Sequence, residues 1–294
     1  METKKQTPIP PSELIINSDG SIFHLHLKPE QLADRIVLVG DPDRVTMIGR
    51  YLTDVECDVL NREFHSITGR YAGKRLTIIS HGIGGDNIDI VINELDALAN
   101  IDFSTRLPRP DLRSLTMVRI GTSGGLQPWS PIGTYVAAER AVGFDGVPYF
   151  YADTERIRDL RLEAALREQL DWRIDGLRPY AVPADAELTD RITGNDIMRG
   201  ITIATCSFYG AQGRSLRIPL ADPDLNRKIE AFEHEGRQIG NFEMESASLA
   251  ALAALLGHRA LTVCCIIAGR VAKNMNVDYK ASIVGLIEKV LERI

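Results

Sequence analysis

Short, continuous runs of apolar residues recur along this chain, each followed by glycine or polar residues. Such runs are typical of strands that are buried on both faces of a sheet. Strands are predicted at residues 35–40, 115–121, 134–144, 201–207 and 260–269, and two or three more within 57–80, around a tight turn at Ala72-Gly73.

Between these runs, apolar residues are spaced three and four positions apart, which predicts helices with one buried face. The clearest examples are residues 86–100 and the terminal segment 279–294. Asp41 and Pro42 suit the N-cap and first position of a helix over 42–51. Further helices are predicted at residues 154–170, 222–236 and 242–256. Buried strands that alternate with helices predict an α/β fold whose largely parallel sheet is covered on both faces.

The first twenty residues, 1–20, are polar and contain several prolines, so we expect them to form an N-terminal arm. A length of 294 residues suits one large α/β domain or two small ones. No repeat or linker divides the remainder, which predicts a single domain over residues 21–294. Within it, the polar and proline-containing residues 101–114 predict a loop.

Composition narrows the class of protein. The formal net charge is -6, which gives no indication of a nucleic-acid partner or a basic membrane surface. No apolar run is long enough to span a membrane, and the N-terminus lacks the apolar segment of a signal peptide. The four cysteines have no metal-binding spacing, so we expect reduced cysteines in a cytoplasmic protein without a metal site.

Arginines follow the carboxyl ends of four predicted strands, where open α/β sheets bind their ligands. These arginines are Arg44, Arg119, Arg214 and Arg270. One arginine at such a position is usually paired with a carboxylate, but four in an acidic protein favour an anionic or strongly polar ligand. Arg44 falls in the first turn of its helix, where the macrodipole favours an anion rather than a cation.

The loop RIGTSGG, residues 119–125, matches the G-x-S-x-G pattern of serine hydrolases, with Ser123 as the candidate nucleophile. Partners follow in hydrolase order, Asp222 or Asp224 and then His234 or His258. A nucleophile elbow needs a helix directly after the serine, however, and the prolines in LQPWSPIG oppose one. A serine hydrolase is therefore an alternative reading rather than the favoured one.

Two carboxylates, Glu243 and Glu245, precede the apolar run SASLAALAALL, which predicts a buried helix ended by Gly257. Carboxylates at a helix N-terminus are stabilised by the macrodipole. Residues two apart on a helical turn point to different sides, so we expect separate roles for them. For Glu243 we expect a structural role, as a cap of the helix.

Six short motifs occur in a characteristic order: VGDPDR (39–44), REF (62–64), GIGG (82–85), RIGTSGG (119–125), FYGAQGR (208–214) and FEMES (242–246). Together they resemble the nucleoside phosphorylase-I family, over roughly residues 22–294. The resemblance implies a single α/β domain built around a mixed, partly barrel-like sheet. It also implies a homodimer or a homohexamer.

The resemblance assigns roles to individual residues. The implied phosphate ligands are Gly40, Arg44, Arg119 and Thr122, with Arg62 donated by a neighbouring subunit. The implied ribose ligands are Met244 and Glu245, with Thr122 nearby and His24 reaching the 5′-hydroxyl across the subunit interface. The base would stack on Phe208 and be bound by Gln212 and Arg214, with Arg270 behind. Catalysis would depend on Arg119, Thr122, Glu245, Gln212 and Arg214.

The implied reaction is reversible phosphorolysis of uridine to uracil and ribose 1-phosphate, with inorganic phosphate as co-substrate and no cofactor or catalytic metal. Where the purine branch of the family carries an aspartate, this chain has Gly269-Arg270, which favours a pyrimidine. The alternative within this fold is a purine nucleoside or nucleotide phosphorylase or nucleosidase, such as one that hydrolyses AMP with water. The implied partners are a nucleoside and phosphate, with no nucleic acid and no membrane.

Overall fold

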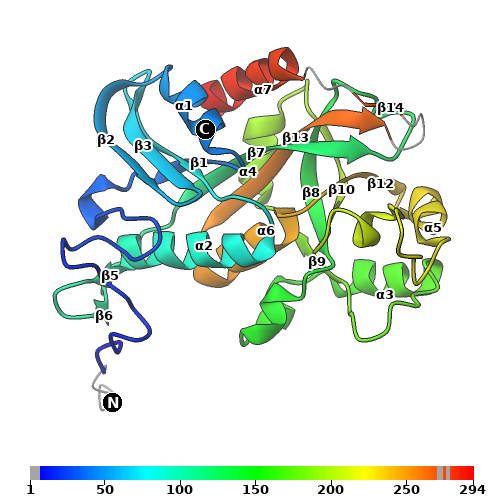
Figure 1. The fold of residues 1–294 in the computed structure, drawn as a ribbon, viewed down its shortest axis with the longest axis horizontal. Helices are drawn as coiled ribbons and strands as arrows, with labels where there is room; N and C mark the ends of the chain where they lie inside the picture. The colour runs from blue at the N-terminus through cyan, green and yellow to red at the C-terminus, as the bar shows by residue number, and fades with distance from the viewer. Residues whose placement is uncertain (1–6, 270–273, 276–278) are drawn as a thin grey trace. The chain divides into compact units, whose positions relative to one another are not determined.

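The computed structural model describes residues 7–269, 274–275 and 279–294 (Figure 1). Contacts within the chain define two compact units. The first lies within residues 1–82 and 90–116, and the second within residues 83–89 and 117–294. The expected division into an arm over 1–20 and one domain over 21–294 stays a prediction.

The first unit contains four neighbouring strands of the main sheet, in the order β1-β4-β3-β2. Its strands are β1 (Arg35–Val39), β2 (Thr53–Asn61), β3 (Phe64–Tyr71) and β4 (Lys74–Ser80). The β1–β4 ladder is parallel, and the β2–β3 and β3–β4 ladders are antiparallel. The tight turn expected at Ala72-Gly73 is present, with φ of 47° and 80°.

Helix α1 (Pro42–Gly49) packs on β1, β3 and β4 of this sheet. It begins as its sequence predicts, because the Asp41 carboxylate accepts a hydrogen bond from the Asp43 N–H at 3.0 Å and Pro42 opens the helix. Helix α2 (Gly85–Asn100) also matches its predicted range.

The arm and the predicted loop 101–114 contact each other within the first unit. The loop contains a small hairpin of β5 (Ile101–Asp102) and β6 (Leu107–Pro108). The short 3-10 helix η1 (Pro29–Gln31) lies far earlier in the chain, just before β1. The Arg106 guanidinium donates to the Ile9 carbonyl at 2.7 Å, and the Ile9 N–H donates to the Arg106 carbonyl at 2.9 Å. These bonds order arm residues that composition alone describes as polar and irregular.

The second unit is built on a sheet that closes on itself. Its strands are β7 (Thr116–Gly125), β8 (Tyr135–Gly143), β9 (Tyr180–Pro183), β10 (Met198–Ala204), β11 (Glu233–His234), β12 (Arg237–Glu243), β13 (Arg259–Gly269) and β14 (Asn274–Met275). The order β12-β10-β8-β13-β7 returns to β12 because β7 also pairs with β12, at Gly124 and Gly125. The β8–β10 and β10–β12 ladders are parallel, whereas β7–β12, β8–β9 and β8–β13 are antiparallel. This closure confirms the mixed, partly barrel-like sheet.

Helices cover the strands of the second unit. They are α3 (Leu160–Gln169), α4 (Ala186–Thr193), α5 (Leu225–Ala231), α6 (Ser246–Leu256) and α7 (Lys280–Arg293), with 3-10 helices η2 (Val147–Phe150), η3 (Thr154–Ile157) and η4 (Gly210–Gln212). The apolar α6 packs on β8, β10 and β13, while α4 and α7 pack together against β13. The predicted α/β fold is confirmed.

Three predicted helix boundaries are wrong. The segment 154–170 is divided into η3 and α3, and the segment 222–236 contains only α5, followed by the β11–β12 hairpin. That hairpin turns at Glu235 and Gly236, whose φ values of 50° and 73° are incompatible with a continuing helix. Helix α6 begins at Ser246 rather than at 242, because β12 continues to Glu243.

Candidate active site

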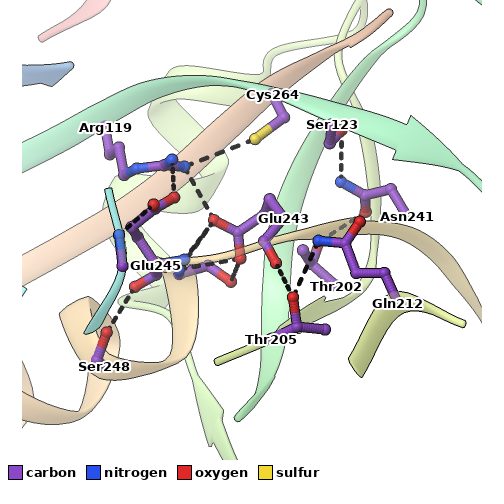
Figure 2. Close-up of polar contacts among 12 residues, drawn as sticks. Arg119, Ser123, Thr202, Thr205, Gln212, Asn241, Glu243, Glu245, Ser248 and Cys264 are labelled. Atoms are coloured by element: carbon purple, nitrogen blue, oxygen red, sulfur yellow. Dashed lines mark hydrogen bonds and ion pairs between the residues drawn. The ribbon is translucent and has the colours of Figure 1, made fainter. Parts of the chain in front are cut away.

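The candidate site lies at the carboxyl ends of β10 and β12, in the second unit. The two strands are parallel neighbours, so the segments that follow them emerge side by side (Figure 2). The Thr205 N–H, just after β10, donates to the Glu243 carbonyl at 2.9 Å. The predicted ribose residues Met244 and Glu245, which follow β12, and the predicted base residues that follow β10 are thereby held close together.

Glu243 closes the N-terminus of α6. Its carboxylate accepts from the Ser246 N–H at 3.0 Å, the Ser246 hydroxyl at 2.5 Å and the Glu245 N–H at 2.9 Å. The two N–H donors are among the first N–H groups of the helix, which have no partner within it. The expected capping role of Glu243 agrees with this geometry.

The expectation that Glu243 and Glu245 point to different sides is wrong. Residue 245 precedes α6 with φ of −138°, so the two glutamates do not lie on one helical turn. Both carboxylates reach the guanidinium of Arg119: Nη1 lies 3.0 Å from Glu243 Oε2, and Nη2 pairs with Glu245 (Figure 2). The three side chains form one buried cluster.

Arg119 comes from β7 and is only 4% exposed. It fits because Gly121 has no side chain, since a Cβ there would lie 2.5 Å from Arg119 Nη1. Burial alone would lower the pKa of Arg119, but the charges of Glu245 and Glu243 outweigh it and raise that pKa, so the guanidinium stays charged. Burial also raises the pKa of the neighbouring Cys264 thiol to about 12, so Cys264 is a neutral core residue.

The cluster of Arg119, Glu243 and Glu245 carries one positive and two negative charges when all are ionised. Burial raises the pKa of Glu245, and Glu243 adds to this, while Arg119 and the Gly84 N–H oppose it. The Gly84 N–H donates to Glu245 Oε1 at 2.8 Å. Glu245 is therefore oriented by fixed partners and binds a proton more readily than an exposed glutamate. Met244, between the two carboxylates, is partly buried.

The predicted base residues also come together. The Arg214 guanidinium carbon lies 3.8 Å from the centroid of the Phe208 ring, which is a cation–π contact. Arg214 Nη1 donates to Gln212 Oε1 at 2.5 Å and to the Phe208 carbonyl at 2.6 Å. Gln212 ends η4 and is 4% exposed, whereas Phe208 is 49% exposed. A planar ring and paired amide and guanidinium groups are suited to recognising a nucleobase.

Other predicted residues lie as follows. Thr122 is partly buried in β7. In the first unit, Gly40 directly follows β1, and a Cβ there would lie 3.3 Å from the Gly82 carbonyl oxygen. Arg44 lies in the first turn of α1, and Arg62 is exposed in the β2–β3 turn with φ of 55°. Arg270 falls outside the described residues.

His24 is held by Glu94 within the first unit. Its Nδ1 lies 2.6 Å from Glu94 Oε1, and Glu94 also accepts from the backbone N–H groups of His24 and Leu25. The Asn61 side chain donates to the His24 carbonyl at 2.7 Å. A histidine anchored through Nδ1 and its own backbone has a fixed ring orientation.

The hydrolase reading is not supported by the geometry. Ser123 lies within β7, which continues to Gly125 without an elbow, and its hydroxyl accepts from the Asn241 amide at 2.9 Å. A Cβ at Gly125 would lie 2.2 Å from the Ser130 carbonyl oxygen. The glycines of this motif therefore permit close packing of the chain beside β7.

Sequence reasoning missed Thr205, which is buried and bonds both Gln212 and the backbone of Glu243. Its position after β10, between a strand and a predicted binding loop, was the only available signal.

Among the helices of the described residues, none has both the length and the apolar character that a membrane span requires.

Comparison with known proteins places this geometry in a family. The phosphorylase superfamily matches residues 34–291. The chain belongs to the phosphorylase superfamily. Proteins similar to this chain include the uridine phosphorylase of Thermococcus kodakarensis, which is 31% identical over 86% of this chain and 79% of its own length. The uridine phosphorylase of Escherichia coli is 28% identical over 86% of this chain and 88% of its own length.

A protein of known structure has the same fold as this chain. The nucleoside phosphorylase of Trypanosoma brucei, described as showing uridine phosphorylase activity, superposes with a TM-score of 0.87 at 28% identity. The similarity covers 95% of this chain and 98% of that one. Together these relatives support a nucleoside phosphorylase, which is a pentosyltransferase.

Proposed function

We propose that this protein is a uridine phosphorylase, which converts uridine and inorganic phosphate to uracil and ribose 1-phosphate, and the reverse. The observation that carries the proposal is the cluster of Phe208, Gln212 and Arg214, bonded through Thr205 to Glu243, which lies two residues before Glu245. Groups suited to a base are thus joined to a carboxylate suited to a sugar.

Cleavage of a glycosidic bond passes through a sugar with oxocarbenium character. Glu245 binds the ribose hydroxyls in this proposal, and its negative charge stabilises the positive charge that develops on the ring. Its bonds to Arg119 and the Gly84 N–H fix its orientation before substrate arrives, so little reorganisation is needed in the transition state. Met244 packs against the sugar.

The departing uracil takes the electrons of the broken bond and becomes an anion. Arg214 and the Gln212 amide can donate hydrogen bonds to the ring as that charge grows, which stabilises the transition state more than the ground state. Phe208 offers an aromatic face for stacking, and in the structure the Arg214 guanidinium lies over this ring. Arg270 is proposed to lie behind the base.

Phosphate supplies the nucleophile at the anomeric carbon. Its proposed ligands are Arg119, Thr122, Gly40 and Arg44, with Arg62 donated by a neighbouring subunit. Arginine forks bind phosphate oxygens bidentately, and an amide at a helix N-terminus favours an anion. The proposed reaction requires no cofactor, because attack by phosphate and departure of uracil are both polar steps.

The proposed assembly is a homodimer or a homohexamer in which His24 and Arg62 reach the site of a neighbouring subunit. The anchoring of His24 by Glu94 supports a preformed contact with the 5′-hydroxyl. The exposed position of Arg62 in a turn supports donation to another chain.

The deciding experiment is a spectrophotometric screen of uridine, thymidine, inosine and adenosine, each with and without phosphate. We expect loss of uridine that requires phosphate. Turnover of a purine nucleoside, or cleavage that proceeds equally without phosphate, would instead identify a purine phosphorylase or a nucleosidase.

A further inference from the structure

Thr205 lies between the base residues and the sugar residues of the proposed site, and has no role among the predicted ligands. It is fully buried directly after β10. Its hydroxyl lies 3.2 Å from the Glu243 carbonyl oxygen and 2.9 Å from Gln212 Nε2 (Figure 2). Its N–H also donates to the Glu243 carbonyl at 2.9 Å.

The direction of these hydrogen bonds follows from the chemistry of the groups. The carbonyl of Glu243 can only accept, so the Thr205 hydroxyl uses its one hydrogen there. The hydroxyl oxygen must then accept from Gln212, which requires the amide nitrogen, not the amide oxygen, on the Thr205 side.

The other end of the Gln212 amide leads to the same orientation. The guanidinium of Arg214 can only donate, and its Nη1 lies 2.5 Å from Gln212 Oε1. In a flipped amide, the nitrogen would face the Arg214 guanidinium, donor against donor, and the oxygen would face the Thr205 hydroxyl oxygen, acceptor against acceptor. Both bonds would be lost in a buried site, where unmade hydrogen bonds are most costly.

We infer that Thr205 is a positioning residue that fixes which end of the Gln212 amide donates and which accepts, and that this orientation selects uracil over cytosine. The inference rests on the proposed function. Uracil presents an N–H at N3 beside its carbonyl oxygens, whereas cytosine has a bare N3 acceptor beside an amino donor. These patterns are reversed, so an amide held in one orientation suits only one of them.

The same residue joins the base side of the site to the sugar side. The backbone N–H and the hydroxyl of Thr205 both donate to the carbonyl of Glu243, two residues before Glu245. Gln212 is therefore placed relative to the end of β12, after which the proposed ribose carboxylate follows. Loss of the hydroxyl breaks this link without removing any proposed ligand.

The test compares Thr205→Val, which removes only the hydroxyl at nearly constant shape, with Thr205→Ser, which keeps it. Thr202→Val is the matched control, because Thr202 is likewise buried, three residues earlier in β10, and its hydroxyl donates to Asn241 Oδ1 at 2.8 Å. The measurements are kcat/KM for uridine, inhibition by uracil and by cytosine, and the free energy of unfolding.

We expect Thr205→Val to lower kcat/KM for uridine about tenfold, the effect of about one hydrogen bond, and to reduce the preference for uracil over cytosine similarly. Thr205→Ser should stay within about threefold of the native enzyme, as should Thr202→Val. Equal losses of activity in Thr205→Val and Thr202→Val, or no rescue by serine, would overturn the inference.

A double-mutant cycle of Thr205→Val and Gln212→Leu in urea unfolding decides the hydrogen bond independently of any activity. We expect the double variant to lose less stability than the sum of the single variants, since the two share one bond. Additive losses would overturn the inference even in an active enzyme. If the cycle shows coupling but the native protein does not cleave uridine, the hydrogen bond stands and only the proposed function is contradicted.

Discussion

Gln212 is the residue at which the proposed chemistry separates most clearly from stability. It ends a short 3-10 turn and is bonded by Thr205, Arg214 and Asn226 through its side chain and carbonyl. We expect Gln212→Ala to lower kcat/KM for uridine about a hundredfold, because donors to a developing anion act mainly in the transition state. The melting temperature should fall by only a few degrees, about as for one or two lost hydrogen bonds.

Thr193→Val is a suitable control for this variant, because the buried Thr193 hydroxyl donates to the Thr189 carbonyl within α4 and accepts from Arg199, both outside the proposed site. It should lower the melting temperature comparably and leave uridine cleavage intact. A Gln212→Ala protein whose activity declines only in proportion to unfolding would speak against the proposed role.

The charge of Glu245 leads to a second prediction at the residue scale. Burial raises the pKa of this carboxyl above its ordinary value of 4.5, and the proposed mechanism needs it ionised. The kcat/KM for uridine should therefore fall as pH decreases through the raised pKa, at a higher pH than for an exposed glutamate. Glu245→Gln should remove most activity at every pH.

Stability should change with pH in the opposite sense. Between 4.5 and the raised pKa, the unfolded chain releases the Glu245 proton while the folded chain retains it, so the free energy of unfolding decreases as pH rises. Urea unfolding of the native protein and of Glu245→Gln over this range measures the difference. Identical pH slopes would mean that Glu245 does not bind its proton more tightly in the folded state.

Among the elements, α6 depends on an unusual cap. Glu243 satisfies the first N–H groups of the helix and also pairs with buried Arg119. We expect Glu243→Ala to lower the free energy of unfolding by about 3 kcal/mol, because it leaves buried donors unpaired. Asp185 is an ordinary N-cap that accepts from the Leu188 N–H at 2.7 Å. Asp185→Ala should lower the free energy of unfolding by about 1 kcal/mol. Equal losses in urea unfolding would show that the buried cluster adds little.

The elements that the sequence predicted well are those in which one periodicity is uninterrupted. Strands β1 and β13 are continuous apolar runs, and α7 has a clear helical period. Strand β12 was not predicted, and a helix was expected from residue 242, because carboxylates before an apolar segment also suit a helix start. Only pairing with β10 and β7 shows that Asn241 and Phe242 are still in a strand.

At the scale of the whole molecule, the closure of the second unit's sheet could not be derived from periodicity, because β7 and β12 are far apart in the chain and meet through two residue pairs. The resemblance to a family supplied that expectation. Likewise, the motifs identified Glu245, Gln212 and Arg214, but the bond from Thr205 depends on side-chain directions that a linear sequence does not encode.

The proposed assembly makes a prediction that concerns the complete oligomer. If each site takes Glu245 from one subunit and Arg62 from its neighbour, Arg62→Ala and Glu245→Gln are each inactive alone but complement each other when mixed. In a mixed dimer, one site has both native residues and the other has neither. Random reassembly of equal amounts should thus restore about a quarter of native activity, since half of the dimers are mixed.

The measurement is uridine phosphorolysis after the two variants are unfolded together and refolded, with separately refolded variants as the control. Recovery is expected only in the joint sample, because subunits must exchange partners. A second pair, Glu245→Gln with Gln212→Ala, carries both changes on residues bonded through Thr205 within one chain. Because Glu245 and Gln212 serve the same site of the same chain, every site in a mixed dimer carries one of the two changes. This pair should therefore regain no activity on mixing. Failure of the first pair to recover would place Arg62 outside the neighbour's site.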